Sequence, residues 1–266
     1  MKSHNVYHEK TIIEQFSKQA IPFAKLPGHH DSIQMLIEMS NIDKNGLVLD
    51  VACGPGLVAC EFAKIASHVT GIDITEKMIT QAKGHQQKKG LFNLSWDVGT
   101  VLPLPYEPES FSVVITRYSF HHFLDPQAVL NEMVRVCKPG GKIMVIDVVQ
   151  PPEKAAAYDH LEKLRDPSHV HALTFPEMAS IIDASGLSNV RTAQYKVEGE
   201  LEQQLRASFP NPGDEDKIRE IFKSDLEFDK IGINIHQHEN KIHFAVPIMV
   251  IVGEKKSNTY EPILSQ

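Results

Sequence analysis

Cysteine, positive charge and long apolar runs are all scarce in this chain of 266 residues. The three cysteines, Cys53, Cys60 and Cys137, are too few and too scattered for a disulfide framework, so we expect reduced thiols in a cytoplasmic protein. Lysine and arginine number 27 against 34 aspartates and glutamates, and the formal net charge of −7 disfavours a nucleic-acid groove or an anionic membrane surface as a partner. No stretch approaches the roughly 18 apolar residues of a membrane span, and the start of the chain lacks the apolar core of a signal peptide.

The apolar residues that are present form short runs that alternate with longer amphipathic segments, which is typical of a parallel sheet covered by helices. With 42% hydrophobic residues, the chain suits one large domain. Asp125 and Pro126 begin the best-defined helix, and the "KPGG" of residues 138–141 ends it. The expected fold class is α/β, with a doubly wound, mostly parallel sheet. Up to residue 150 the predicted strands are 46–52, 68–74, 94–98, 110–116 and 142–149.

After residue 150 the regular alternation changes to a more helical segment. Neither an internal repeat nor a low-complexity linker separates this segment from the first half. We therefore expect the late helices to be an insertion that caps the sheet rather than an independent domain. The predicted helices are 152–166, 175–186, 201–209 and 214–230, and the predicted strands are 187–197 and 243–255.

A glycine-rich turn within "VLDVACGPG", residues 48–56, follows the first predicted strand. In open α/β sheets, ligands bind at the carboxyl ends of the strands where the strand order reverses, and this turn is expected there. Gly54 and Gly56 permit backbone angles and a close approach that side chains would block. Two ligand classes suit such a turn. One is a dinucleotide, because "GPGLVA" satisfies the loose G-x-G-x-x-A pattern, and the other is S-adenosylmethionine.

Three carboxylates favour the second ligand. Asp50, Asp73 and Asp97 stand at the ends of three successive predicted strands, where they would repel a diphosphate and attract a cationic sulfonium. Asp73 can accept hydrogen bonds from ribose hydroxyls, and Asp97 can accept one from an adenine amine beside the backbone N–H of Val98. An NAD(P)-dependent oxidoreductase remains an alternative, as does a cofactor-binding protein without turnover.

Several stretches between about residues 40 and 150 resemble, in order, the class I S-adenosylmethionine-dependent methyltransferases. The most similar branch contains the ubiquinone and menaquinone biosynthesis C-methyltransferases. The stretches are "VLDVACGPG", "GIDIT", "LPLPYEPESFSVVITRYSFHHFLDP" and "EMVRVCKPGGKIMVID". The resemblance implies a seven-stranded Rossmann-like methyltransferase sheet with a helical cap insertion. It also implies methyl transfer from S-adenosylmethionine to a small-molecule acceptor by direct displacement.

The same resemblance suggests how one methyltransferase domain, 1–255, is divided. Nothing in the sequence indicates an oligomeric state or identifies the acceptor. The expected parts are N-terminal lid helices in 1–40, a cofactor-binding half in 41–150, a substrate-side half with helical cap insertions in 151–242, the last strand in 243–255, and a flexible tail in 256–266.

The resemblance also implies a set of cofactor contacts, in which Ala52 stands where the first glycine of the motif is common. Phe16 and Gln19 lie in a segment that resembles a lid over the cofactor. The implied contacts are Asp50, Ala52, Gly54 and Gly56 at the methionine-binding turn, Asp73 at the ribose, Ile74 and Met78 against the adenine, Asp97 and Val98 as the adenine reader, and Thr116 and Arg117 near the sulfonium.

The stretch "RYSFHHF", residues 117–123, is expected on the methyl-facing side of the pocket. A histidine of near-neutral pKa is a natural general base, so His121 is the first candidate and His122 the second. A mechanism that relies on proximity alone, without a dedicated base, is an open alternative. The expected acceptor contacts are Tyr118, Arg165 and His169. The H-x-H pairs at 169–171 and 236–238 lack a third ligand by spacing, so we expect no metal site.

Overall fold

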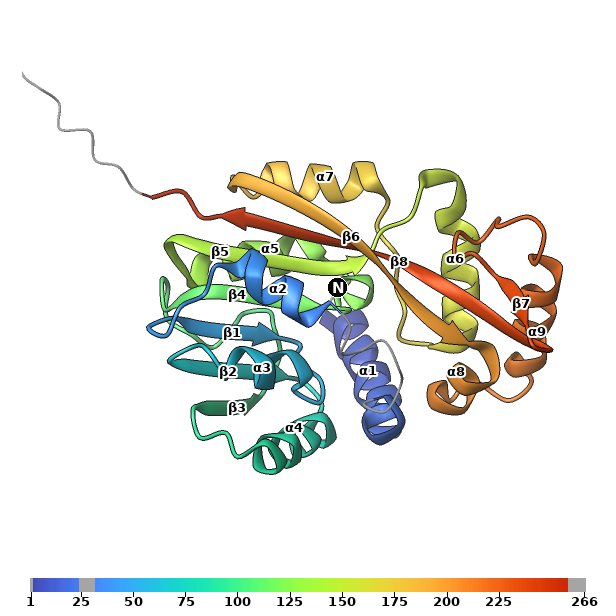
Figure 1. Cartoon of the computed structure of the whole chain (residues 1–266), viewed down its shortest axis with the longest axis horizontal. Coiled ribbons are helices and arrows are strands. Elements are labelled where there is room, and N and C mark those ends of the chain that lie inside the picture. The colour runs from blue at the N-terminus through green and yellow to red at the C-terminus, as the bar shows by residue number, and fades with distance from the viewer. Residues whose placement is uncertain (1, 24–31, 258–266) are drawn as a thin grey trace, which may run out of the picture.

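One mixed β-sheet organises the part of the chain that the computed structural model describes, residues 2–23 and 32–257 (Figure 1). Its strands are β1 (Leu47–Val51), β2 (His68–Asp73), β3 (Leu94–Val98), β4 (Phe111–Arg117), β5 (Cys137–Val148), β6 (Ser188–Glu200), β7 (His236–His238) and β8 (Lys241–Glu254). The helices are α1 (Lys2–Phe23), α2 (Ile33–Ser40), α3 (Leu57–Phe62), α4 (Glu76–Lys89), α5 (Pro126–Val136), α6 (Pro152–Arg165), α7 (Phe175–Ala184), α8 (Leu201–Ser208) and α9 (Asp214–Ser224), with a 3-10 turn η1 (Phe120–His122).

The strand order is β3-β2-β1-β4-β5-β8-β6, with β7 paired to β8 beside this path. β1 to β5 run parallel, whereas β8 is antiparallel to each of its partners, β5, β6 and β7. The expected doubly wound, mostly parallel Rossmann-like sheet is therefore confirmed. Residues 258–266 of the expected tail and residues 24–31 of the expected lid lie outside the described residues.

The predicted elements differ from the structure mainly at their ends. The helix expected over 214–230 ends at Ser224, because Asp225 turns the chain there. Its carboxylate accepts hydrogen bonds from the backbone N–H groups of Lys230 and Ile231 at 2.7 and 3.0 Å. β7 was not predicted, since three exposed residues carry no period of two that a sequence pattern could show.

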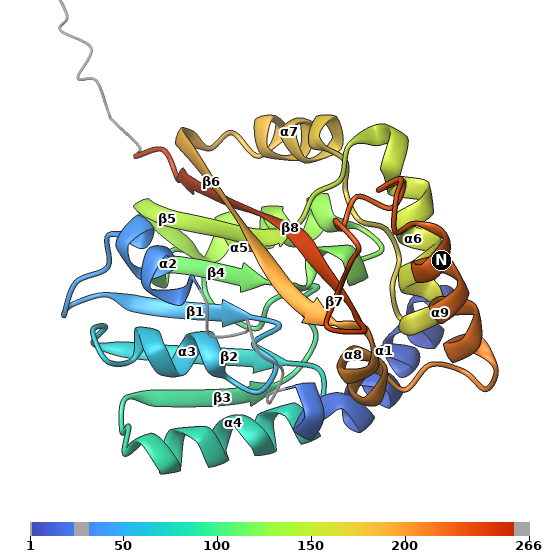
Figure 2. The ribbon, with the colours of Figure 1, turned by 45° about the vertical axis from the view of Figure 1, so that its right-hand side comes forward.

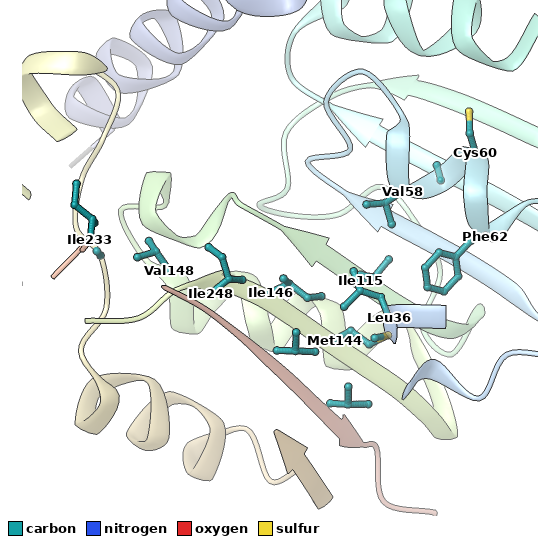
Figure 3. Packing of buried hydrophobic residues seen from close by; sticks show 14 of the residues in the cluster. Leu36, Val58, Cys60, Phe62, Ile115, Met144, Ile146, Val148, Ile233 and Ile248 are labelled. Carbon is teal, nitrogen blue, oxygen red and sulfur yellow. The ribbon is translucent and has the colours of Figure 1, made fainter. Parts of the chain in front are cut away.

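Alternation of side chains along the central strands produces two hydrophobic clusters, one on each face of the sheet. On β4, Val113 and Ile115 belong to one cluster and Val114 to the other. Figure 3 shows Ile115 and Met144 together with Leu36 of α2 in the first of these clusters. Because both faces are buried, the strands read as continuous apolar runs, which is the pattern that identified them in the sequence.

The helices divide between the two faces. α2 and α3 supply residues to the first cluster, as do α6, α8 and α9 toward its far end, whereas α5 and α7 supply residues to the second. In Figure 2 the arrowheads of β1, β2 and β4 point toward the side where α1 and α6 lie. The carboxyl ends of the parallel strands therefore face this group of helices. None of the helices in residues 2–23 and 32–257 is long and apolar enough to cross a membrane.

The glycine turn after β1 is held by packing as well as by its backbone angles. Gly56 has φ +75°, and a Cβ atom placed on it would lie 2.5 Å from the Trp96 ring and 2.8 Å from the Ala82 methyl. Gly54 has φ +52°, but a Cβ atom there would meet nothing within 4 Å. The two glycines therefore have different roles. Gly56 lets the turn pack against the Trp96 ring, whereas Gly54 leaves its own backbone uncovered by neighbouring side chains.

Replacing each glycine by alanine should separate these roles. Gly54→Ala should lower the free energy of unfolding by about 1–2 kcal/mol, the cost of a left-handed residue with a Cβ. Gly56→Ala should lower it by about 1–3 kcal/mol more, because it also overpacks the Trp96 contact. Urea denaturation of the ligand-free protein measures both values. Equal losses for the two variants would contradict the packing role of Gly56.

Candidate functional site

A first cavity of about 220 Å³ lies at the carboxyl ends of β1, β2 and β4. Helix α1 forms part of its wall through His8, Ile12 and Phe16, which are spaced along one face of the helix. Predicted cofactor contacts found in its lining are Asp50, Ala52, Gly54, Asp73, Ile74, Met78 and Arg117. The structure thus brings together most of the residues expected at the glycine turn and at the end of β2.

Two residues with unusual backbone angles frame this cavity. Ala52, directly after β1, has φ 55°, and Tyr118, directly after β4, has φ 59°. Such left-handed angles are unfavourable for residues with a Cβ, and they cluster at functional sites. The first glycine of the motif is thus replaced by an alanine that keeps a conformation suited to glycine.

Asp73 holds the two loops of the cavity together. One carboxylate oxygen accepts a hydrogen bond from the Gly54 backbone N–H at 2.9 Å, and the other accepts one from the Thr75 backbone N–H at 2.8 Å. Burial raises the pKa of Asp73, and these backbone donors oppose that shift. The carboxylate is therefore fixed in orientation at the end of β2, where it lines the cavity.

Asp50 is also buried, with 2% of its surface exposed. It accepts a hydrogen bond from the Ala59 backbone N–H at 3.1 Å, at the start of α3. Burial raises its pKa to about 7, so its charge at neutral pH depends on a nearby cation. Arg117 lines the same cavity and lowers the pKa of Asp50. Asp50 therefore provides a carboxylate whose charge a cationic ligand would stabilise.

Four predicted cofactor contacts are not part of this lining. Asp97 accepts a hydrogen bond from the Tyr106 hydroxyl at 2.8 Å, and the Val98 side chain is 55% exposed. Thr116 is buried, and its hydroxyl donates to the Val51 carbonyl at 2.8 Å, so it ties β4 to β1 beneath the cavity floor. Gly56 packs against Trp96, as described above. Their roles toward a cofactor stay predictions.

A second cavity of about 150 Å³ adjoins the first. Its apolar side chains come mainly from α8, α9 and β8, and its polar side chains come from η1, β5 and α6 and from Glu198 and Glu200 of β6. Sequence reasoning missed Asp147 and Glu162, although Asp147 follows the same pattern of an acid near the end of a strand, whereas Asp166 was noted in the sequence as a polar candidate beside Arg165. The expected residues found in its lining are Tyr118, His121, His122, Arg165, Phe16 and Gln19.

Phe16, Tyr118 and His122 line both cavities and form their shared wall. The rings of Phe16 and His122 meet edge to face, with centroids 5.1 Å apart. The His122 backbone carbonyl accepts a hydrogen bond from Nε2 of His8 at 2.7 Å. Helix α1 therefore packs directly on the turn that carries the two candidate bases.

The neighbouring histidines of this turn have opposite electrostatic environments. Nδ1 of His121 lies 2.6 Å from a carboxylate oxygen of Asp147. Burial lowers the pKa of His121, but the charge of Asp147, its hydrogen bond and the charge of Glu162 together outweigh burial and raise the pKa above its usual value. Burial and the charge of His121 lower the pKa of His122 to about 3, so His122 is neutral. The pKa values of two adjacent imidazoles are therefore shifted in opposite directions.

On α6 and the loop after it, two carboxylates and a cation line the second cavity. Arg165 donates from Nε to both carboxylate oxygens of Glu162, each at 3.0 Å, and from Nη2 to one of them at 2.5 Å. Asp166 accepts hydrogen bonds from the Ser168 hydroxyl at 2.5 Å and from the Gln19 amide at 3.3 Å. Gln19 belongs to α1, so this helix also reaches the polar end of the second cavity.

His169, an expected acceptor contact, lies behind this cavity rather than in its lining. Its Nε2 is 2.8 Å from a carboxylate oxygen of Asp159. The other Asp159 oxygen lies 2.6 Å from Nδ1 of His171, whose Nε2 is 2.9 Å from Glu177. In the part of the chain that the structure describes, no group of three or more His, Cys, Asp or Glu side chains is arranged to hold a metal ion.

A sheet of this order, with a ligand cavity at its glycine turn, is the architecture of a Rossmann-like methyltransferase. The chain belongs to the methyltransferase domain family, whose model matches residues 42–225. It is an S-adenosylmethionine-dependent methyltransferase, which confirms the expected class of enzyme and cofactor. The comparisons do not support the alternative of a nucleotide-dependent oxidoreductase.

Two bacterial relatives illustrate the extent of the match. The uncharacterised methyltransferase YcgJ of Bacillus subtilis is 27% identical over 248 residues, covering 91% of this chain and 98% of the relative. Its crystal structure matches with a TM-score of 0.79 and 26% identity over 86% of this chain and all of that chain. The ubiquinone/menaquinone biosynthesis C-methyltransferase UbiE of Bdellovibrio bacteriovorus is 33% identical over 158 residues, covering 56% of this chain and 66% of the relative.

The first cavity suits S-adenosylmethionine on its own chemistry. Gly54 exposes bare backbone to open space, and Asp50 and Asp73 present carboxylates suited to a cation and to hydroxyl donors. Ile74 and Met78 add apolar surface beside them. A phosphate-bearing ligand would meet two carboxylates at this turn, so the donor set matches the cofactor of the family.

His171 makes the stability of the loop after α6 dependent on pH. Burial lowers its pKa, but its hydrogen bonds to Asp159 and Glu177 outweigh burial and raise the pKa above its usual 6.5. These two contacts therefore stabilise the folded state fully at a pH below 6.5, the pKa of His171 in the unfolded chain. The stabilisation is lost as the pH rises through the higher pKa of His171 in the folded state.

The variant His171→Gln should reduce this pH dependence. Between about pH 6 and pH 9 the melting temperature of the wild type should fall more than that of the variant, because only the wild type loses an imidazolium held by two carboxylates. Thermal melts across this pH range measure the difference. His236→Gln is a matched control, since the exposed His236 contacts a backbone carbonyl rather than a carboxylate. Parallel curves for wild type and His171→Gln would contradict the assignment.

Proposed function

We propose that this methyltransferase transfers a methyl group by direct displacement to a small-molecule acceptor in the second cavity. The observation that carries the proposal is the shared wall of Phe16, Tyr118 and His122 between the two cavities. Bound S-adenosylmethionine supplies an electrophilic methyl group on a sulfonium. The protein then needs mainly to align the acceptor with that group and to remove a proton where the acceptor carries one.

Residues of the first cavity would hold the cofactor. Asp73, fixed by the backbone of Gly54 and Thr75, retains lone pairs for ribose hydroxyls. Asp50 and the bare backbone of Gly54 suit the charged methionine end, while Ile74 and Met78 suit the adenine ring. For Arg117, we retain a place near the sulfonium as a proposal, supported by its position in the lining beside Tyr118.

The size and chemistry of the second cavity support a small acceptor. Phe222, Phe244 and Ile248 give it an apolar end, while His121, Arg165 and Asp166 give it a polar end. A volume of about 150 Å³ accepts roughly one six-membered ring, judging from benzene in an apolar cavity of that size. Several carboxylates in the lining disfavour the phosphates of a nucleic acid.

His122 is the better placed of the two candidate bases. Its Nδ1 lies 3.0 Å from the Ser168 backbone carbonyl, which can only accept, so Nδ1 carries the hydrogen and Nε2 carries the lone pair. His122 is also part of the wall between the cavities. Its low pKa keeps it neutral, and so weak a base suffices where the acceptor atom is a hydroxyl oxygen, because the protonated ether that forms on methylation is strongly acidic. Sequence reasoning had ranked His121 ahead of it.

His121 is suited to a different task. The bond to Asp147 occupies Nδ1 and favours the charged ring, so the residue is suited to donating a hydrogen bond from Nε2. Asp147 itself is fixed by backbone N–H groups of Phe120 and Val148 at 2.6 and 2.7 Å. We assign His121 to orienting the acceptor and His122 to removing its proton.

Incubation with methyl-radiolabelled S-adenosylmethionine tests the acceptor class. A bacterial extract is split by ultrafiltration into small-molecule and macromolecular fractions, and each is offered to the enzyme. Label should move into the small-molecule fraction, because the second cavity has room for little more than one ring. Transfer only into protein or nucleic acid would overturn the proposal. A chiral methyl group on the cofactor should be inverted in the product, whereas retention would exclude a single displacement.

Substitution of the histidines tests their roles with the acceptor found in that assay. His122→Gln should lower kcat by about 10²–10⁴-fold, the usual contribution of a general base, with little change in the Kd of S-adenosylmethionine. His121→Gln should raise the KM of the acceptor more than it lowers kcat. His160→Gln, at an exposed histidine of α6, is the control. A large loss of kcat in His121→Gln, with mainly a raised acceptor KM in His122→Gln, would instead identify His121 as the base.

A further inference from the structure

We propose that the acceptor carries a basic amine and that Asp166 binds this amine at the polar end of the second cavity. The inference rests on the proposed function, because it concerns the occupant of the same cavity. Asp166 follows α6 directly, lines the second cavity and has 1% of its surface exposed. A carboxylate in this position must be neutralised by a proton or balanced by a cation, since burying an unbalanced charge is costly.

Protonation does not balance Asp166. Burial opposes its ionisation, while the charge of the neighbouring Arg165 and the hydrogen bonds from Ser168 lower its pKa. The Ser168 hydroxyl and the Ser168 backbone N–H both donate to one carboxylate oxygen, at 2.5 and 2.9 Å. Both bonds stabilise the ionised form of the carboxyl group. Asp166 is therefore an ionised group at neutral pH.

The other buried carboxylates of this cavity each have a cation of their own. Asp147 is paired with His121 at 2.6 Å, and Glu162 is paired with Arg165 through the bonds described above. Asp166, by contrast, has the neutral donors Ser168 and Gln19 as its hydrogen-bond partners among the described residues. Three buried carboxylates thus face two cations, and Asp166 is the one without an ion pair.

The nearby basic groups are already engaged or neutral. Nε and Nη2 of Arg165 bind Glu162, and Nη1 lies 3.3 Å from the Ser208 hydroxyl. His122 is kept neutral by burial and by the charge of His121, and burial also lowers the pKa of His169. Glu198 and Glu200 line the same cavity and add further negative charge. The buried carboxylates of this cavity therefore outnumber its buried cations by one, and a protonated amine on the ligand would supply the missing positive charge.

The position of Asp166 suits an acceptor with a ring-sized body. The apolar end of the cavity contains Phe222 and Phe244, whose rings meet edge to face at 5.5 Å. A ring held there would direct a polar substituent toward His121, His122 and Asp166. Gln19 of α1 donates to the second Asp166 oxygen at 3.3 Å, so α1 packs against the same carboxylate. The class of ligand is a small cyclic compound with a protonated amine.

Binding of three probes that share one ring tests this inference without any turnover. Benzylamine, benzyl alcohol and benzoate are titrated by NMR into the protein saturated with S-adenosylhomocysteine, which occupies the first cavity. At neutral pH the protonated benzylamine should bind at least about tenfold more tightly than benzyl alcohol, the value of one hydrogen bond to a charged group. Benzoate should bind least tightly of the three.

In Asp166→Asn the affinities of benzylamine and benzyl alcohol should converge to within about twofold, because the amide keeps the shape without the charge. Asp183→Asn, at an exposed carboxylate of α7, should retain the wild-type ranking. Benzoate binding as tightly as benzylamine, absence of any preference, or an amine preference that survives in Asp166→Asn would overturn the proposal. If Asp166→Asn does not fold, the wild-type ranking alone decides.

The two proposals fail separately. An amine preference at Asp166 together with label only in macromolecules would reject the small-molecule function and keep the cation site. Transfer of label to a small molecule, with benzoate as the tightest probe, would keep the function and reject the amine. The mass of the labelled product identifies whether it contains a basic nitrogen.

Discussion

The divergence of the chain after two adjacent strands, β1 and β4, is the constraint on which both cavities depend. The chain leaves β1 for α3 and β2 and leaves β4 for α5 and β5, so the connections pass to opposite faces of the sheet. A gap at the carboxyl ends follows from this topology. Left-handed backbone at Ala52 and Tyr118 turns the chain away on each side of the gap. The strain of two such residues is compensated by a core that is buried on both faces.

Burial of charge determines what the residues around this gap can do. His121 and His122 are adjacent in sequence, yet one faces a buried carboxylate and the other faces a backbone carbonyl. The same low-dielectric environment therefore favours the charged form of one imidazole and the neutral form of the other. Asp50 shows the effect for a carboxylate, because burial brings its pKa to about 7 and makes its charge sensitive to what occupies the cavity.

The sequence was sufficient for the sheet and for the cofactor end of the site. Strands buried on both faces have a strong apolar signal, and the glycine turn with Asp50 and Asp73 lies within a short stretch of chain. The acceptor cavity could not be derived in the same way. Its walls combine Gln19, Asp166 and Phe244, which are far apart in sequence and meet only through tertiary packing. The orientation of Asp97 toward Tyr106 is likewise a contact that strand-end position alone does not specify.

Helix α1 has a consequence for how the two ligands depend on each other. One face of it carries His8, Phe16 and Gln19, which contact the first cavity, the shared wall and Asp166 in turn. A ligand that holds this helix in place from one cavity also completes the wall of the other. A displacement of this helix would therefore change the walls of both cavities together, so the two binding sites share one structural element.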